Sequence, residues 1–274
     1  MRVNACIVAY ENPLRMLQSA VNSVLEEKEE IATLYFIDNS PTQRLRKPFE
    51  DSTQYIYTGA NLGFGKANNI AMQKSIEEGV KYHLLVNPDI SFDKGVVKAM
   101  ADFMDDNPDV GLLTPKVLYP DGTIQYLCKL IPTPFDLIGR RFFGWGPFRK
   151  FVDQRNKLFE LQHTSYNRQM DVPILSGSFM MLRTSVLKEV GLFDERYFMY
   201  LEDFDLCRRM GEVSRTVFNP EVVVVHEYEK GSYFNRRLFK YHIISALKYF
   251  TKWGWFFDKK REKANAKCLN ALNS

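Results

Sequence analysis

The first 90 residues repeat one pattern, in which a short apolar run ends in a cluster of polar residues. The runs cover residues 3–9, 31–37, 55–57 and 84–86, and apolar residues at helical spacing separate the first run from the second. This alternation predicts an α/β fold, with a mostly parallel sheet and helices on its faces. The polar residues then gather at the carboxyl edge of the sheet, where open α/β sheets bind ligands.

The segment LLVNPDIS, residues 84–91, carries this pattern most plainly. Its three leading apolar residues are typical of a buried strand, and Pro88 ends the strand because proline cannot donate to a ladder. Asp89 therefore lies just beyond the carboxyl end of a buried strand. A solvated aspartate at an ordinary strand exit is the simpler interpretation of these eight residues taken alone.

The composition indicates a folded domain, because 45% of the 274 residues are hydrophobic and 26% are charged. The four cysteines are widely spaced without a C-x-x-C pair, which argues against zinc and against a disulfide framework. The first residues enter an apolar strand without a signal peptide's long apolar region, and no apolar run has membrane-spanning length. We therefore expect a cytoplasmic protein.

The segment GANLGFGKANN, residues 59–69, contains three glycines and three asparagines. It predicts a loop whose backbone can approach a ligand closely, followed by a helix whose amino end attracts an anion. The dinucleotide fingerprint G-x-G-x-x-G is not met, because Asn68 stands where its third glycine should be. A flexible surface loop remains an equal alternative.

Two later segments carry further candidate residues. Glu202, Asp203 and Asp205 follow the apolar residues 198–201, which favours a cavity wall over a solvated helix start. His226 ends the apolar run 222–225 and so occupies the same kind of position as Asp89. Between residues 131 and 170 the pattern gives way to aromatic, glycine and basic residues around RRFFGWGPFRK. There we expect a partly helical loop that is either an acceptor-binding flap or an insertion.

Together these segments resemble family 2 inverting glycosyltransferases of the GT-A fold, particularly rhamnosyltransferase-like bacterial members that build surface polysaccharide. The likeness is carried, in chain order, by IVAYENP, FIDNS, NLGFGKANN, LLVNPDI, SGSFMMLR, GLFDERYFMYLEDFDLCRR and VVVHE. It implies one Rossmann-like GT-A domain over residues 1–229, with a nucleotide-sugar half (1–115) and an acceptor half (116–229). A basic amphipathic helical tail (230–274) would follow.

The resemblance also implies an activity and partners. A sugar would pass with inversion from a nucleotide-diphosphate donor to a hydroxyl of a glycan or lipid-linked glycan, in cell-surface polysaccharide biosynthesis. Rhamnose on dTDP is the first expectation for the donor, and UDP-linked sugars are the next.

The same resemblance implies roles for individual residues. Asp203 would be the catalytic base, with Glu202 and Asp205 as supporting residues. Asp89 and His226 would hold a divalent metal, Mg²⁺ or Mn²⁺. The residues expected to bind the nucleotide sugar are Ala9, Tyr10, Glu11, Asp38, Asn61, Gly63, Asn68, Asn87 and Gly177.

The expected chemistry suits these residue types. A divalent cation with oxygen ligands stabilises the charge on a departing nucleoside diphosphate, and a carboxylate can accept the acceptor's proton. Asn87 stands where the D-x-D motif of the family has its first acid, and an amide is a weaker ligand, which puts metal affinity in question. A position near a helix start lowers the pKa of Asp203, which predicts a weak base assisted by its positioning.

Two other functions compete with this interpretation. A nucleotidyltransferase should carry a glycine-rich, arginine-containing loop after the first strand, whereas AYENPLR has no glycine. A catalytically inactive sugar-nucleotide-binding module would not require Asp89, Asp203 and His226 together. Nucleic-acid binding has no recognised motif to support it.

The carboxyl-terminal tail is strongly basic. From Lys230 onward, eleven Lys or Arg residues face two acids, an excess of +9, so the preceding 229 residues sum to −5. On a helical projection one face collects Phe239, Ile243, Ala246, Phe250, Trp253 and Phe257. The opposite face collects Arg237, Lys248, Lys252 and Lys259. Packing against the domain explains the apolar face, whereas the basic excess favours salt-sensitive attachment to an anionic membrane, on the inner face of the cytoplasmic membrane.

Overall fold

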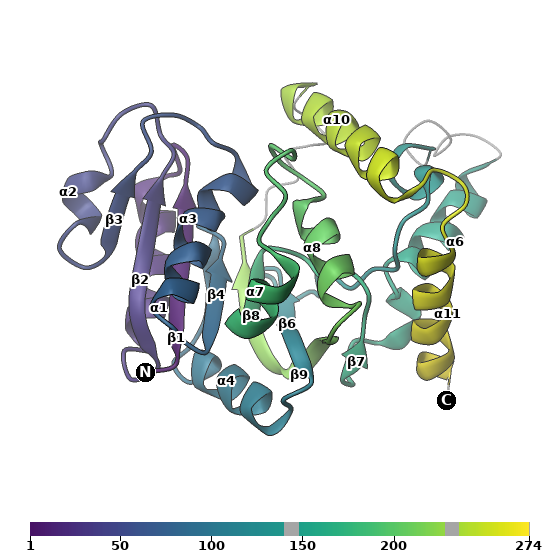
Figure 1. Ribbon diagram of the computed structural model, residues 1–274, viewed down its shortest axis with the longest axis horizontal. Coiled ribbons are helices and arrows are strands. Elements are labelled where there is room, and N and C mark those ends of the chain that lie inside the picture. Colours follow the sequence, from purple (N-terminus) through teal and green to yellow (C-terminus); the bar gives the residue numbers. More distant parts are fainter. Residues whose placement is uncertain (140–147, 228–235, 274) are drawn as a thin grey trace.

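The computed structural model describes residues 1–139, 148–227 and 236–273, which form a central sheet with helices on both faces (Figure 1). The strands are β1 (Val3–Ala9), β2 (Ile31–Asp38), β3 (Gln54–Tyr57), β4 (Tyr82–Val86), β5 (Ile90–Ser91), β6 (Val110–Leu118), β7 (Met170–Asp171), β8 (Phe179–Arg183) and β9 (Arg215–His226). The α-helices are α1 (Leu14–Leu25), α2 (Arg46–Phe49), α3 (Phe64–Glu77), α4 (Val96–Asp106), α6 (Arg149–Phe159), α7 (Thr184–Val190), α8 (Glu202–Met210), α10 (Arg236–Trp253) and α11 (Lys259–Asn273).

The sheet has the strand order β3-β2-β1-β4-β8-β6-β9-β5, and β7 pairs with β9. The four strands β3, β2, β1 and β4 are all parallel, as predicted. In the other half β6 and β9 are parallel as well, so the sheet is mostly parallel as expected, whereas β8 runs antiparallel to both β4 and β6. β8 begins opposite Val86, at the carboxyl edge of β4, because the chain reaches it through a turn rather than a crossover helix.

Successive side chains of each strand point to opposite faces of the sheet, so each strand contributes to two hydrophobic cores. Val3, Ala5 and Ile7 of β1 lie in the core that the sheet shares with α1 and α4. Cys6 points to the opposite face, which packs against α3. A third cluster joins β8 and α8 to the carboxyl-terminal helices.

The two stretches expected to be loops contain more helix than predicted. α3 begins at Phe64, inside the glycine-rich segment, with Gly63 as its amino-terminal cap. Between residues 131 and 170 lie the π-helical turn η1 (Phe135–Gly139), α6 and the 3₁₀ turn η3 (Gln162–Thr164). Residues 140–147, the centre of the predicted flap, lie outside the described residues.

The carboxyl-terminal tail is part of the domain rather than an appendage. α10 lies along the top of the molecule and α11 along its right-hand side (Figure 1). Ala246 and Phe250 of α10 are buried, as the packing explanation of the predicted apolar face requires. The place of Phe257 on that face is wrong, because α10 ends at Trp253 and Phe257 is 95% exposed. A buried ion pair joins Arg208 of α8 to Asp258 ahead of α11, with 2.8 Å between Nη2 and Oδ2.

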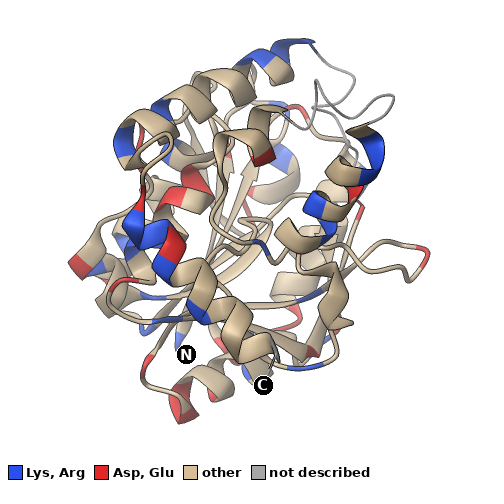
Figure 2. Cartoon of the chain, turned by 90° about the vertical axis from the view of Figure 1, so that its right-hand side faces the viewer, with Lys and Arg blue, Asp and Glu red and all other residues tan. Residues whose placement is uncertain are grey.

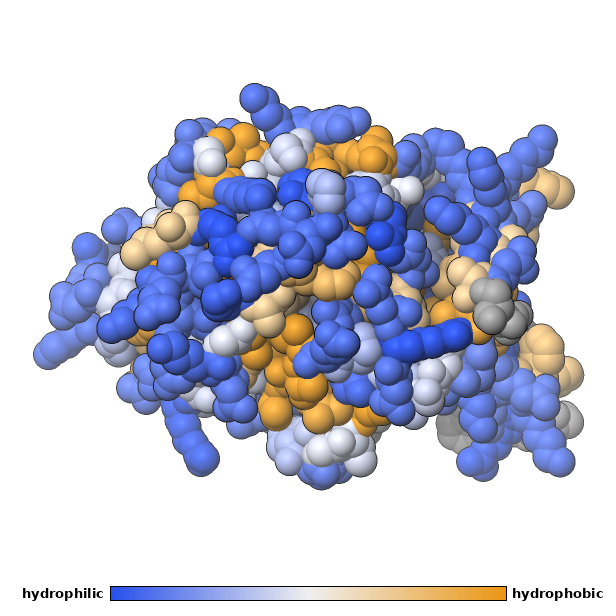
Figure 3. All heavy atoms as spheres, turned by 90° about the horizontal axis from the view of Figure 1, so that it is seen from below, coloured by the Kyte–Doolittle hydropathy of each residue, from blue (hydrophilic) through white to orange (hydrophobic). Residues whose placement is uncertain are grey.

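Lys248 and Lys252 of the predicted polar face are exposed, and both side chains also reach groups outside α10. Lys252 forms ion pairs with Asp194 and Asp205, at 3.0 and 2.6 Å, and Lys248 donates a hydrogen bond to the Arg196 carbonyl at 2.5 Å. Both side chains therefore tie α10 to residues 194–205, at and just before the start of α8. A search of the described helices finds none that is long and apolar enough to cross a membrane. The underside of the molecule is mainly hydrophilic, with apolar residues gathered near its centre (Figure 3).

The glycine-rich segment packs closely against the loop that precedes α8. Phe64 donates its backbone N–H to the Phe198 carbonyl at 3.0 Å, and a Cβ on Gly63 would lie 2.1 Å from that carbonyl oxygen. Asn69 holds the same loop through two hydrogen bonds to the Phe193 backbone, at 2.9 and 3.0 Å. The glycine at position 63 is therefore required by this backbone crossing, which positions the start of α8.

Replacing Gly63 by alanine should destabilise the protein strongly. Gly191 provides a matched control, because it has nearly the same backbone angles (φ 81°, ψ 169° against 82° and 177°) and its added Cβ would meet only Arg209, at 3.8 Å. Both variants should lose stability from backbone strain, on the order of 1–3 kcal/mol. Gly63→Ala should lose a further ~1–3 kcal/mol from overpacking, measured by urea denaturation. Equal losses would show that the crossing tolerates a side chain.

Candidate active site

One cleft of about 1380 Å³ lies at the carboxyl edge of the sheet and takes residues from both halves of the chain. Its walls come from the ends of β1, β2, β4 and β9, the turn before β8 and the start of α8. The predicted site residues that line it are Tyr10, Asn61, Gly63, Asn87, Asp89, Gly177, Glu202, Asp203 and His226.

The other predicted residues are not among those that line the cleft, and these are Ala9, Glu11, Asp38, Asn68 and Asp205. Asp38 is fully buried, and its carboxylate accepts hydrogen bonds from the Tyr55 hydroxyl at 2.5 Å and the Ser40 N–H at 2.9 Å. Asn68 donates to the Phe64 carbonyl within α3. Both side chains shape the backbone beside the cleft in this structure.

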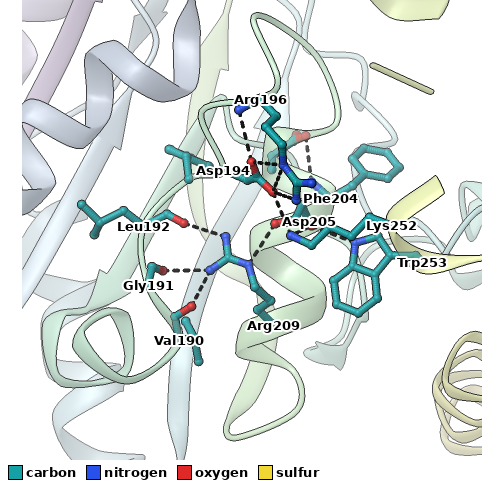
Figure 4. Close-up of polar contacts among 12 residues, drawn as sticks. Val190, Gly191, Leu192, Asp194, Arg196, Phe204, Asp205, Arg209, Lys252 and Trp253 are labelled. Atoms are coloured by element: carbon teal, nitrogen blue, oxygen red, sulfur yellow. Dashed lines mark hydrogen bonds and ion pairs between the residues drawn. The ribbon is translucent and has the colours of Figure 1, made fainter. Parts of the chain in front are cut away.

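Asp205 points from α8 toward the carboxyl-terminal helices (Figure 4). Its fully buried carboxylate binds Arg209 Nε at 2.9 Å, Trp253 Nε1 at 2.8 Å and Lys252 Nζ at 2.6 Å. Lys252 also reaches Asp194 at 3.0 Å, so α10 is tied both to α8 and to the loop before it. Asp205 thus anchors the helix that carries Asp203.

The cleft also contains residues that the sequence had not singled out, among them Asn12, Asn39, Gln125 and Lys129. Asn12 and Asn39 lie within the segments IVAYENP and FIDNS, so those segments could have pointed to them. Gln125 and Lys129 lie in a stretch without periodicity or motif, and only the fold brings them to the cleft.

Asp203 lies in the first turn of α8, where Gly177 holds it. The Gly177 N–H donates to Asp203 Oδ2 at 3.0 Å, and a Cβ at Gly177 would lie 3.2 Å from the Asp203 Cβ. Burial raises the pKa of Asp203, although the Gly177 N–H and the charge of Lys129 oppose the shift. The predicted lowering was therefore wrong, because burial outweighs the helix start. A raised pKa makes this carboxylate a better proton acceptor.

Glu202 is the buried neighbour of Asp203 and has a different environment. Its side chain is in the cleft wall, and its Oε2 atom has no hydrogen-bond partner among the described residues. Burial, and then the charge of Asp203, raises the pKa of Glu202 to about 8. Burial therefore favours the protonated form of Glu202 at neutral pH.

Asp89 and His226 meet in the same cleft. His226 Nε2 lies 3.1 Å from Asp89 Oδ1, and His226 Nδ1 lies 3.0 Å from Gln125 Oε1. The antiparallel pairing of β5 with β9 brings the two backbones together, since Ile90 pairs with His226. Across the described ranges, no group of three or more His, Cys, Asp or Glu side chains could hold a metal. This pair could supply a carboxylate oxygen and an imidazole nitrogen to a divalent cation, and substrate phosphates would complete its coordination.

A family model and individual relatives both relate this chain to glycosyltransferases. The family model "Glycosyl transferase family 2" matches residues 5–191. The N-acetylglucosaminyl-diphospho-decaprenol L-rhamnosyltransferase of Mycobacterium tuberculosis is 32% identical over 180 residues, which cover 62% of this chain and 57% of that protein. The dTDP-rhamnosyl transferase RfbF of Shigella flexneri is 24% identical over 231 residues, covering 82% and 68%. The chain thus spans little more than half the length of the first relative.

A likeness among solved structures supports the fold. GalNAc-T7, solved with UDP, GalNAc and Mn²⁺, superposes with a TM-score of 0.61 over 83% of this chain and 44% of that one, at 14% identity. The expected GT-A fold is confirmed.

The buried Glu202 predicts a stability that falls with rising pH. In the unfolded chain this carboxyl ionises near its ordinary pKa of 4.5, whereas in the folded protein it holds its proton to about pH 8. The free energy of unfolding should therefore fall across this window, by up to about 1.4 kcal/mol per pH unit.

Glu202→Gln removes this titration, so its stability relative to the unmodified protein should increase between pH 5 and pH 8.5 in urea denaturation. Glu195→Gln is the control, because Glu195 is half-exposed and pairs only with Lys66 among the ion pairs of the described residues, at 3.1 Å. A difference between Glu202→Gln and the unmodified protein that stayed constant with pH would contradict the assignment.

Proposed function

The chain belongs to glycosyl transferase family 2, and on this premise we propose that it transfers a sugar, with inversion, from a nucleotide-diphosphate donor to an acceptor hydroxyl. The observation that carries the proposal is that Asp89, Asp203 and His226 line one cleft, although they come from distant parts of the sequence. The acceptor in this proposal is a glycan or lipid-linked glycan, in cell-surface polysaccharide biosynthesis.

The donor in this proposal is a dTDP-linked rhamnose, with UDP-linked sugars as the second choice. The names of two relatives, both rhamnosyltransferases, support this choice. The amino-terminal wall of the cleft offers Tyr10, Asn39 and Asn61 to the nucleotide. An aromatic ring and two amides suit a base and a ribose, which stack and form neutral hydrogen bonds.

Asp89 and His226 would hold a divalent cation together with oxygens of the donor diphosphate. Their facing atoms, Asp89 Oδ1 and His226 Nε2, are 3.1 Å apart, so both could contact one ion. Such a cation supplies charge neutralisation of the diphosphate as it departs. Asn87 lies beside Asp89 in the cleft and would contribute a neutral oxygen rather than a second charge.

Asp203 would take the proton of the acceptor hydroxyl as that oxygen attacks the sugar. The Gly177 N–H holds one carboxylate oxygen in place, and the raised pKa strengthens the base. Glu202 would remain protonated at neutral pH and limit the negative charge beside the base. Attack on the face of the sugar opposite the departing diphosphate inverts the anomeric centre.

Amide substitution should separate the two adjacent acids. Asp203→Asn keeps an oxygen that can accept the Gly177 N–H, so folding and donor binding should survive while transfer falls by roughly 100-fold or more. Glu202→Gln replaces a group that is already uncharged at pH 7, so it should change transfer by less than about 5-fold. Steady-state transfer from dTDP-rhamnose, with dTDP affinity measured in parallel, checks both. The roles would be exchanged if Glu202→Gln were the inactive variant.

Removal of the metal ligand should abolish metal dependence. Asp89→Ala should lose turnover and its response to Mn²⁺, because Asp89 is the one carboxylate in NPDI. Asn87→Asp should retain activity and bind the metal more tightly, because a carboxylate is the stronger ligand. Titrating activity with Mn²⁺ after EDTA treatment measures both effects. Full activity of Asp89→Ala in EDTA would exclude the metal role.

We also propose that the turn between α10 and α11 attaches to an anionic membrane surface. Phe256 and Phe257 are 75% and 95% exposed there, and Lys259 and Lys263 are exposed directly after them. Figure 2 shows basic residues along the uppermost helix, α10, and at the start of the helix that ends at the carboxyl terminus. Exposed aromatics next to lysines suit a lipid headgroup interface, where each basic residue contributes ~1 kcal/mol.

Polar substitution of these two phenylalanines should weaken membrane binding. The double variant Phe256→Ser/Phe257→Ser should sediment less with anionic liposomes, and binding of the unmodified protein should fall with added salt. Leu25→Ser is the control, because Leu25 is 36% exposed on α1, far from this turn in the sequence. Removing the whole tail would be uninformative, since α10 is built into the core. Unchanged sedimentation of the double variant would place the membrane contact elsewhere.

A further inference from the structure

Gln125 is a buried polar side chain at the back of the cleft, and the catalytic proposal gives it no role. It is 3% exposed and follows the turn at residues 120–122. Its side chain reaches His226, 101 positions later in the chain, through both ends of its amide group. A buried amide of this kind is retained only where its hydrogen bonds are satisfied.

The two contacts determine which end of the amide faces the imidazole. Gln125 Nε2 lies 2.8 Å from the backbone carbonyl oxygen of His226. A carbonyl oxygen can only accept, so the amide nitrogen must be the group that faces it. Gln125 Oε1 is then the atom that lies 3.0 Å from His226 Nδ1. An amide oxygen also only accepts, so the hydrogen of the imidazole must be on Nδ1.

This hydrogen bond selects one tautomer of the neutral ring. With its hydrogen on Nδ1, neutral His226 has a lone pair on Nε2, the atom 3.1 Å from Asp89 Oδ1. A carboxylate oxygen likewise offers lone pairs. Two acceptor atoms at this distance are complementary to a cation that both can bind. The other tautomer would place an N–H between them and leave His226 unable to act as a ligand.

Backbone contacts fix the main chain at His226, but the orientation of its imidazole ring depends on a side-chain contact. Ile90 pairs with His226, and the Glu227 N–H donates to the Asp89 carbonyl at 2.9 Å. These contacts hold the two backbones but do not set the rotation of the imidazole or the position of its hydrogen. On its Nδ1 side the ring meets Gln125, whose Oε1 atom lies 3.0 Å away.

We propose that Gln125 is a positioning residue of the metal site, which holds His226 in the tautomer and orientation that present Nε2 beside Asp89. The inference rests on the proposed function, because it requires Asp89 and His226 to bind a divalent cation. Metal-binding histidines commonly donate their second N–H to a carbonyl or carboxylate oxygen, and loss of that partner lowers metal affinity 10- to 100-fold. Here an amide side chain takes that place.

The test measures metal affinity rather than turnover. Free Mn²⁺ is followed by electron paramagnetic resonance in the presence of saturating dTDP, for the unmodified protein and two variants. Gln125→Met keeps the length of the side chain but removes the acceptor, and its Kd for Mn²⁺ should rise 10- to 100-fold. Gln125→Glu keeps an acceptor for Nδ1–H, and its Kd should remain within about 3-fold. Thermal denaturation confirms that both variants are folded.

A second measurement needs no Gln125 variant. Nitrogen-15 NMR of histidine-labelled protein without metal reports the tautomer, and the signal of His226 among the four histidines is assigned by its loss in His226→Ala. We expect the hydrogen on Nδ1. A hydrogen on Nε2 would overturn the inference even if Gln125→Met failed to fold.

The controls separate this inference from the proposed function. If Asp89→Ala and His226→Ala each weaken Mn²⁺ binding while Gln125→Met does not, the metal site stands and the role of Gln125 is rejected. If Asp89→Ala leaves Mn²⁺ binding unchanged, the proposed metal site is wrong. The role of Gln125 is then rejected as well, because it requires that site.

Discussion

The crossing of the Phe198 backbone over Gly63 is the contact on which the arrangement of the site depends. A Cβ at position 63 would overlap the Phe198 carbonyl oxygen, so only glycine allows the chain to pass there. The residues that follow Phe198 lead directly into α8 and place Glu202 and Asp203 in the cleft wall. The segment whose helix start is predicted to attract an anion thus also contacts the loop before α8, which places Asp203 in the same cleft as Tyr10 and Asn61.

α8 is held at several points along its length. Gly177 holds the Asp203 carboxylate, while Asp205, two residues later and turned away from the cleft, is buried among Arg209, Lys252 and Trp253 (Figure 4). A fully buried carboxylate is tolerated only with such partners, because desolvation of its charge is otherwise very costly. The carboxyl-terminal helices therefore support the helix that carries Asp203, while their exposed turn provides the surface proposed to meet a membrane.

The carboxylates at the site differ because their surroundings differ. Asp89 is partly exposed and faces an imidazole, which suits a group that shares a cation with a diphosphate. Asp203 and Glu202 are buried side by side, and burial raises the pKa of both. The three acids therefore differ in environment in a way that suits the separate roles proposed for them, and residue type alone could not have ranked them.

The sequence by itself determined the strands and helices of the amino-terminal half and the gathering of polar strand ends at one edge, because these follow from local periodicity. It also pointed to Asp89, Asp203 and His226, since each stands in a recognisable segment. The tertiary structure decided the direction of β8, the turning of Asp205 away from the cleft and the burial of Asp38. It alone raised the pKa of Asp203 and brought Gln125 to His226 across 101 residues. Burial and long-range contact arise only when the chain is packed, so no local pattern can encode them.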